Sequence, residues 1–173
     1  LAGCGGIWLL EELVSGLQAG AKRGGLFLAG VVMAAAIALH NLPEGMVIGA
    51  SYAADLAEAG QDGRMMALVI GLHNIPEGMA VAVPLAAGGA SRGRAVLTTA
   101  AAGAPTVLGA VLGFCLGTMG PGLQMLTLGG ASGAMLYVVF GELLPESFRL
   151  CRSPAPVMAA VLGVLTGMGV VLG

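Results

Sequence analysis

The sequence predicts an all-α protein, a polytopic bundle of transmembrane helices, and three observations point to that class. Charged residues make up 9% of the 173 residues and hydrophobic residues 57%, whereas soluble domains carry about 25% charged residues. The hydrophobic residues lie in runs near the roughly 20 residues that a spanning helix needs. Gly is abundant, with 31 residues, which suits close helix packing in lipid. The net charge of −2 excludes a basic surface for nucleic acid.

The first apolar run, residues 1–18, begins at Leu1 rather than Met, and we interpret it as the end of a helix. The runs that follow predict full helices over residues 25–56, 64–88, 94–117, 123–149 and 154–173. The joints contain the Gly, Pro and Ser that end helices, and they read "QAGAKRGG", "EAGQDGR", "AGGASRGR", "GTMGPG" and "RLCRSPAP". Because the joints are short, neighbouring helices should be antiparallel. We expect residues 1–173 to form a single transmembrane domain.

The basic residues predict the orientation of the chain in the membrane. Most of them lie in alternate joints, those after the first, third and fifth helical segments: Lys22, Arg23, Arg92, Arg94, Arg149 and Arg152. The other joints hold only Arg64. Positive loops face the cytoplasm, so the helix over 25–56 should run outward and the C-terminus should lie outside. We expect an integral membrane protein with this orientation.

One nine-residue motif occurs twice within the apolar runs. "ALHNLPEGM" covers residues 38–46 and "GLHNIPEGM" covers residues 71–79. Residues three or four apart lie on the same face of a helix. Each copy should therefore gather a His, an Asn and a Glu on one face: His40, Asn41 and Glu44 in the first, and His73, Asn74 and Glu77 in the second.

The two copies should also meet in depth. At about 1.5 Å per residue, His40 lies roughly 22 Å and His73 roughly 15 Å from the outer joint. Both depths are near the middle of a hydrocarbon core about 30 Å thick. Pro43 and Pro76 each remove a helical hydrogen bond, and the resulting kinks can absorb the difference. The two helices should then present their polar groups to one point.

The composition of the motif favours a metal site. A carboxylate at mid-membrane costs about 2.5–3.5 kcal/mol on insertion scales, and no Lys or Arg lies near the motif in either helix. A divalent cation is a better candidate than a basic side chain to compensate these carboxylates, because imidazole nitrogen with carboxylate and amide oxygen suits Zn²⁺, Fe²⁺ or Mn²⁺. Two other interpretations stay open. In the first, the motifs are packed polar residues at helix kinks. In the second, they form the site of an intramembrane metalloenzyme. Asn41 and Asn74 argue against the second, because they stand where the HExxH motif has the Glu that serves as base.

These residues resemble the ZIP family (Zrt-, Irt-like proteins) of divalent-metal transporters, in a prokaryotic-type form. "HNLPEG" and "HNIPEG" are similar to that family's fourth and fifth transmembrane helices. Three further segments are similar to the end of the third helix, the fifth-to-sixth connection and the seventh helix: "GGIWLLEELV", "PLAAGGASRGRA" and "GAMLYVVFGELLPES". The family has eight helices. The resemblance therefore implies the C-terminal part of such a transporter, without about the first two and a half helices.

The resemblance also implies roles for individual residues. The transport-site ligands would be His40, Asn41, Glu44, His73, Asn74 and Glu77. Many relatives hold a second metal with a Glu on the sixth helix. Thr106 occupies that position here by spacing, which predicts one strongly held metal. Glu142 matches a position linked to metal exit, where Gly141 replaces a His that often precedes it. Alternatively, Glu142 and Glu146 pair with Arg149 at the membrane boundary.

We therefore expect a transporter that moves a divalent cation from outside into the cytoplasm. We expect Zn²⁺ before other metals as the transported ion. The same ligands also accept Cd²⁺, Fe²⁺ and Mn²⁺. The resemblance implies alternating access and a homodimer in the lipid bilayer of a prokaryotic inner (plasma) membrane. We expect no resident cofactor and no enzymatic activity. A metal-gated cation channel and an intramembrane metalloenzyme are the alternative functions.

Overall fold

The structure, a computed structural model, describes residues 25–58 and 60–172, and every regular element in these two ranges is helical. The all-α class predicted from the sequence is confirmed. The partial helix predicted over residues 1–18 lies outside the described residues.

The helices follow the order of the apolar runs. The first three are α2 (Gly25–Glu58), α3 (Asp62–Ala87) and α4 (Arg92–Thr118). The run predicted as one helix over 123–149 forms three consecutive segments, which are α5 (Pro121–Val138), the π-helical η1 (Val139–Leu143) and α6 (Leu144–Leu150). The last helix is α7 (Ala155–Leu172).

Length and hydropathy make several of these helices candidate membrane spans. In the described part of the chain, 4 stretches are long and apolar enough to cross a membrane: Gly25–Leu56, Asp62–Ala87, Arg92–Thr118 and Pro121–Gly141. A shorter apolar helix covers Ala155–Gly169. These properties agree with the polytopic membrane class.

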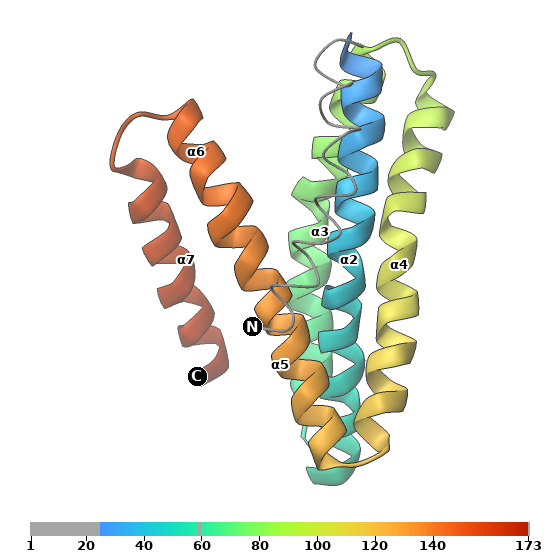
Figure 1. The fold of residues 1–173 in the computed structure, drawn as a ribbon, viewed down its shortest axis with the longest axis vertical. Helices are drawn as coiled ribbons and strands as arrows, with labels where there is room; N and C mark the ends of the chain where they lie inside the picture. The colour runs from blue at the N-terminus through green and yellow to red at the C-terminus, as the bar shows by residue number, and fades with distance from the viewer. Residues whose placement is uncertain (1–24, 59, 173) are drawn as a thin grey trace. The chain divides into compact units, whose positions relative to one another are not determined.

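The chain divides into two compact units between Met135 and Leu136. In the first unit, α2 packs against both α3 and α4, and α3 also contacts α4 (Figure 1). Small and aliphatic side chains form its buried core: Ala34, Val81, Leu85, Ala95 and Ala102. In the second unit, α6 packs against α7. The single domain expected over residues 1–173 stays a prediction.

Glycines let the backbones of α2 and α4 touch. A Cβ at Gly45 would collide with the carbonyl oxygen of Thr106, and a Cβ at Gly109 would collide with that of Leu42. Gly113 lies against the backbone of α2 one turn further along. Small residues spaced four apart permit this close approach between membrane helices. The contact fixes which face of α2 is turned toward α4.

Asp55 holds the joint between α2 and α3. Its Oδ1 accepts a hydrogen bond from the N–H of Asp62 and its Oδ2 accepts one from the N–H of Gly63, both at 2.9 Å. These amides belong to the first turn of α3, where N–H groups have no partner within the helix. Tyr52 packs against Gly63 beside these bonds. The two hydrogen bonds of Asp55 fix the register of α2 and α3, and so the level at which the repeated motifs meet.

Candidate metal centre

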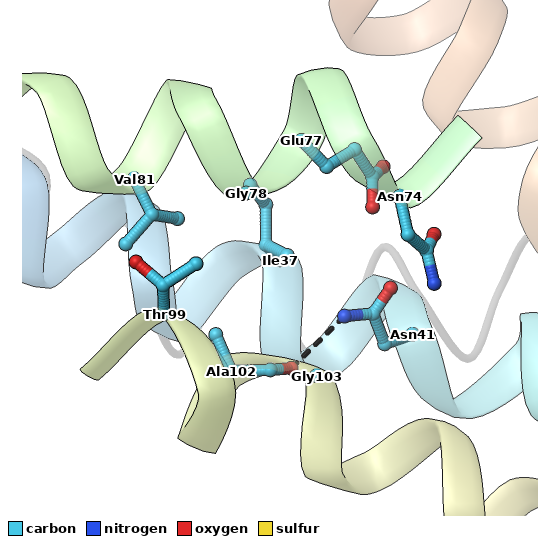
Figure 2. A pocket seen from close by; sticks show the side chains of 9 residues that line it. All are labelled: Ile37, Asn41, Asn74, Glu77, Gly78, Val81, Thr99, Ala102 and Gly103. Atoms are coloured by element: carbon cyan, nitrogen blue, oxygen red, sulfur yellow. Dashed lines mark hydrogen bonds between the residues drawn. The ribbon is translucent and has the colours of Figure 1, made fainter. Parts of the chain in front are cut away.

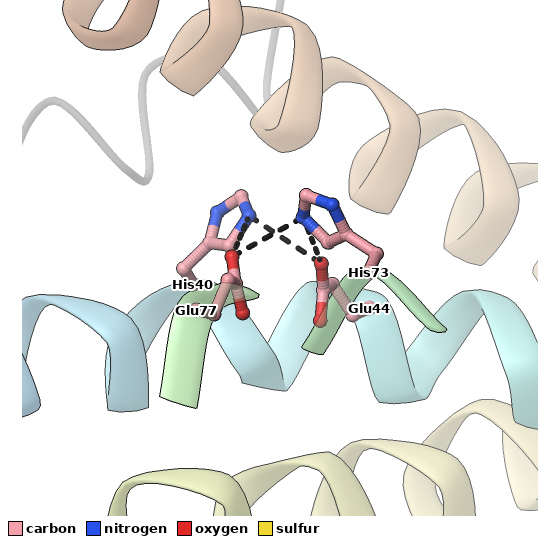
Figure 3. A group of neighbouring side chains, drawn as sticks. All are labelled: His40, Glu44, His73 and Glu77. Carbon is pink, nitrogen blue, oxygen red and sulfur yellow. Dashed lines mark ion pairs between the residues drawn. The ribbon is translucent and has the colours of Figure 1, made fainter. Parts of the chain in front are cut away.

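One His and one Glu from each motif helix meet at a single point (Figure 3). His40, Glu44, His73 and Glu77 each offer one ligand atom, and these atoms lie within 4.8 Å of one another. Nε2 of His40 lies 3.5 Å from Oε1 of Glu44 and 3.6 Å from Oε1 of Glu77. Nε2 of His73 lies 3.5 Å and 3.2 Å from the same two oxygens. The helical spacing pairs each His with its own Glu, and the packing of α2 on α3 joins the two pairs.

Four of the six distances between these ligand atoms match the edges of a tetrahedral metal site. Zinc binds imidazole nitrogen and carboxylate oxygen at about 2.0–2.2 Å, usually with tetrahedral geometry. A tetrahedron with metal–ligand distances of about 2.1 Å has edges of about 3.4 Å. The four nitrogen-to-oxygen distances, 3.2–3.6 Å, bracket that edge length. The group can therefore hold a four-coordinate cation once the remaining pairs of ligand atoms, which lie within 4.8 Å of each other, close toward the same edge length.

The four side chains differ in exposure. The side chain of Glu44 is 0% exposed and that of His40 12%, whereas that of His73 is 47% exposed. The first unit therefore encloses the centre around Glu44 and leaves it open beside His73. A buried carboxylate needs a compensating charge, and the sequence places no Lys or Arg between Arg23 and Arg64. A bound cation would supply that charge.

Asn41, an expected ligand, is turned toward α4. Its Nδ2 donates a hydrogen bond of 2.9 Å to the carbonyl oxygen of Ala102, and the residue is 2% exposed. Asn41 follows His40 by one position, which is about 100° around a helix. Its Oδ1 is buried and has no hydrogen-bond donor among the described residues. Asn41 thus ties α2 to α4 and stands outside the group of two His and two Glu.

Asn74 makes a different contact, although it is the equivalent residue of the second motif. In the amide orientation that satisfies its surroundings, Nδ2 donates to Oε2 of Glu44 at 3.1 Å and to the carbonyl oxygen of Ile70 at 3.3 Å. Oε1 of Glu44 then faces the two imidazoles. Asn74 therefore holds a carboxylate of α2 from its place on α3.

Two further sequence-predicted residues lie apart from this group. The carbonyl of Thr106 lies against Gly45, and its hydroxyl oxygen is buried and finds no partner in the part of the chain that the structure describes. Glu142 lies in η1 and Glu146 in α6, and the side chains of both lie outside the described residues. The roles expected for these residues stay predictions.

A small cavity of about 80 Å³ adjoins the centre between α2, α3 and α4 (Figure 2). Asn41, Asn74 and Glu77 line it from the two motif helices, and Thr99 lines it from α4. The remaining lining is apolar or glycine. The sequence did not reveal Thr99, because α4 carries no copy of the motif and only its packing against α2 and α3 brings Thr99 to this place.

Comparison with known proteins adds to this geometry. The family described as ZIP zinc transporter matches residues 15–173, a range that includes all the described residues. The chain is also 40% identical over 114 residues to the zinc transporter GufA of Myxococcus xanthus. That match covers 66% of this chain and 44% of the relative, so the chain spans less than half of the relative's length. No solved structure matches the chain.

Proposed function

The chain belongs to the ZIP zinc transporter family, and on this premise we propose that it carries a divalent metal cation across a membrane. Its long apolar helices make it an integral membrane protein. Transport rather than catalysis is the function that family membership supports. The ion that the whole protein transports, the direction of transport and the partners of the protein also belong to this proposal.

The observation that carries the proposal is the candidate metal centre that α2 and α3 form together. Each of two imidazole nitrogens lies 3.2–3.6 Å from both of two carboxylate oxygens, in the middle of two candidate spans. We assign His40, Glu44, His73 and Glu77 as the ligands of the transported ion. Asn41 and Asn74 act beside them, Asn74 by holding the Glu44 carboxylate.

Zn²⁺ is the proposed cargo. Nitrogen and oxygen donors in this geometry suit Zn²⁺, and the relative from Myxococcus xanthus is a zinc transporter by name. Cd²⁺, Fe²⁺ and Mn²⁺ are competing cargoes that accept similar ligands. The distribution of Lys and Arg supports an orientation with the C-terminus outside. Movement of the cation from outside into the cytoplasm of a prokaryotic cell is the direction that we propose. A homodimer is the proposed assembly.

Uptake of radioactive ⁶⁵Zn²⁺ into proteoliposomes that contain the full-length protein tests the proposal. We expect uptake that saturates with Zn²⁺ concentration and that unlabelled Cd²⁺ inhibits. A flux that rises in proportion to concentration without saturating would favour the alternative of a metal-gated channel. Absence of any protein-dependent uptake under these conditions would contradict transport.

A further inference from the structure

The cavity beside the centre contains buried oxygen atoms that need hydrogen-bond donors. Asn41 Oδ1 and Thr99 Oγ1 are both buried, and neither has a partner within the described residues. Both residues line the cavity, and Asn41 is 2% exposed. Glu77 lines the same cavity, and Figure 2 shows its carboxylate directed toward Asn41 and Asn74. The large majority of buried polar atoms in proteins have a hydrogen-bond partner, which is a protein group or an ordered water.

The chemistry of these atoms defines what can occupy the cavity. An amide oxygen and an ionised carboxylate are both acceptors only, and Asn41 has already used its Nδ2 on Ala102. The occupant must therefore donate at least two hydrogen bonds. A water molecule does so and can also bond to the hydroxyl of Thr99. The cavity volume of about 80 Å³ is sufficient, because one water needs roughly 10–15 Å³ measured in this way.

A second metal ion is a poorer occupant of this cavity. Glu77 is the one carboxylate residue that lines it. Glu44 directs Oε1 to the two imidazoles and accepts the Asn74 amide on Oε2. A cation here would therefore face one carboxylate that the first site already uses, together with neutral oxygens.

We propose that the cavity between α2, α3 and α4 holds bound water that donates hydrogen bonds to Asn41 Oδ1 and to the Glu77 carboxylate. Asn41 and Thr99 are then positioning residues for Glu77, which they hold through this water, and Asn41 does not bind the metal. The assignment of Glu77 as a ligand rests on the proposed function. Loss of such an outer partner of a metal ligand typically lowers metal affinity about 10- to 100-fold.

A structure of the metal-free full-length protein, at a resolution that shows ordered water, tests the occupant. We expect density within hydrogen-bond distance of both Asn41 Oδ1 and Glu77, with no anomalous signal in the cavity after a Zn²⁺ soak. A cavity without density, or a zinc peak inside it, would overturn the proposal. This result does not depend on transport, so it separates failure of the water site from failure of the proposed function.

A pair of matched variants tests the positioning role. Thr99→Val removes a buried hydroxyl that lines the cavity, and Thr106→Val removes a buried hydroxyl of the same helix that does not. We expect Thr99→Val to weaken Zn²⁺ binding by the purified full-length protein about 10-fold or more, and Thr106→Val to leave it unchanged. Equal affinities for both variants would show that Thr99 does not act on the centre. A wild-type protein that binds no Zn²⁺ would instead refute the proposed function.

Discussion

At the scale of single residues, Glu44 is a carboxylate in a fully buried position. Its side chain is fully buried in the first unit, and its two oxygens face different partners. Oε1 faces two imidazoles and Oε2 accepts the Asn74 amide. Burial of a charge is costly unless it is paired, and a bound cation would pair with this carboxylate.

Replacement of Glu44 by Gln tests this role. The amide keeps the shape and an acceptor for Asn74 but removes the negative charge. We expect Zn²⁺ affinity to fall at least about tenfold, which corresponds to about 1.4 kcal/mol. The metal-free variant should melt at the same or a higher temperature, because an uncompensated buried charge has been removed.

Isothermal titration with Zn²⁺ and thermal unfolding in detergent measure the two effects. Asp62→Asn is the matched control, since it neutralises an exposed carboxylate in the first turn of α3. Wild-type affinity in Glu44→Gln would remove Glu44 from the proposed ligand set.

Acid should compete with the metal at the same centre. Imidazole coordinates a metal only when neutral, so metal binding displaces protons. Ordinary imidazole titrates near pH 6.5. At acid pH, protons compete with the metal for the imidazole nitrogens and should lower Zn²⁺ affinity, with a limit of about tenfold per pH unit for each coordinating imidazole. Zn²⁺ binding measured between about pH 8 and about pH 5 checks this, and affinity that stays constant over the range would exclude imidazole ligation.

The sequence could predict the group of His and Glu but not the separate roles of the two Asn. Residues four apart share a helix face whatever surrounds them, and this local rule pairs His40 with Glu44 and His73 with Glu77. Asn41 and Asn74 are equivalent in the repeat, yet one contacts Ala102 and the other Glu44. Only the position of α4, which packs beside α2, separates them.

At the scale of helices, the approach of α2 to α4 depends on glycine. A Cβ at Gly109 would collide with the Leu42 carbonyl, one residue before Pro43. Gly109→Ala should therefore destabilise the protein by about 1–3 kcal/mol, the usual cost of overpacking, and should weaken Zn²⁺ binding by shifting the first motif.

Gly71→Ala is the matched control for this prediction. Gly71 lies within α3, and a Cβ there meets no atom within 4 Å. Alanine should leave stability unchanged or raise it by up to about 1 kcal/mol through helix propensity. Thermal unfolding of both variants in detergent gives the comparison, and similar melting temperatures would indicate that the α2–α4 contact contributes little.

The helices themselves were largely predictable because Gly, Pro and Ser interrupt the apolar runs. The π-helical segment η1 was not predicted, since the run over 123–149 is interpreted as one helix although Gly141 and Pro145 lie in it. Its cause is local: Pro145 has no N–H for the carbonyl of Gly141, and the N–H of Leu144 bonds to the carbonyl of Val139, five residues back. Such turns commonly occur at functional sites, which fits the expectation that Glu142 acts in metal exit.

At the scale of the whole molecule, composition decides the environment and the repeated motif decides the proposed function. A chain with 9% charged residues cannot cover a water-facing surface, and its long helices are apolar enough to cross a bilayer. Polar groups at mid-membrane depth typically mark ion pathways. The sequence predicted this class because hydropathy is a property of composition. The division into two units depends on contacts between helices, which composition does not reveal.

The central claim is that two membrane helices share one metal ion, and anomalous scattering tests it most directly. Crystals of the full-length protein would be soaked in Zn²⁺ and measured at the zinc absorption edge. We predict one strong peak at about 2.0–2.2 Å from a carboxylate oxygen of Glu44 and of Glu77 and from Nε2 of both His40 and His73. A peak that touches residues of α2 alone or α3 alone, or no peak near these side chains, would contradict the claim.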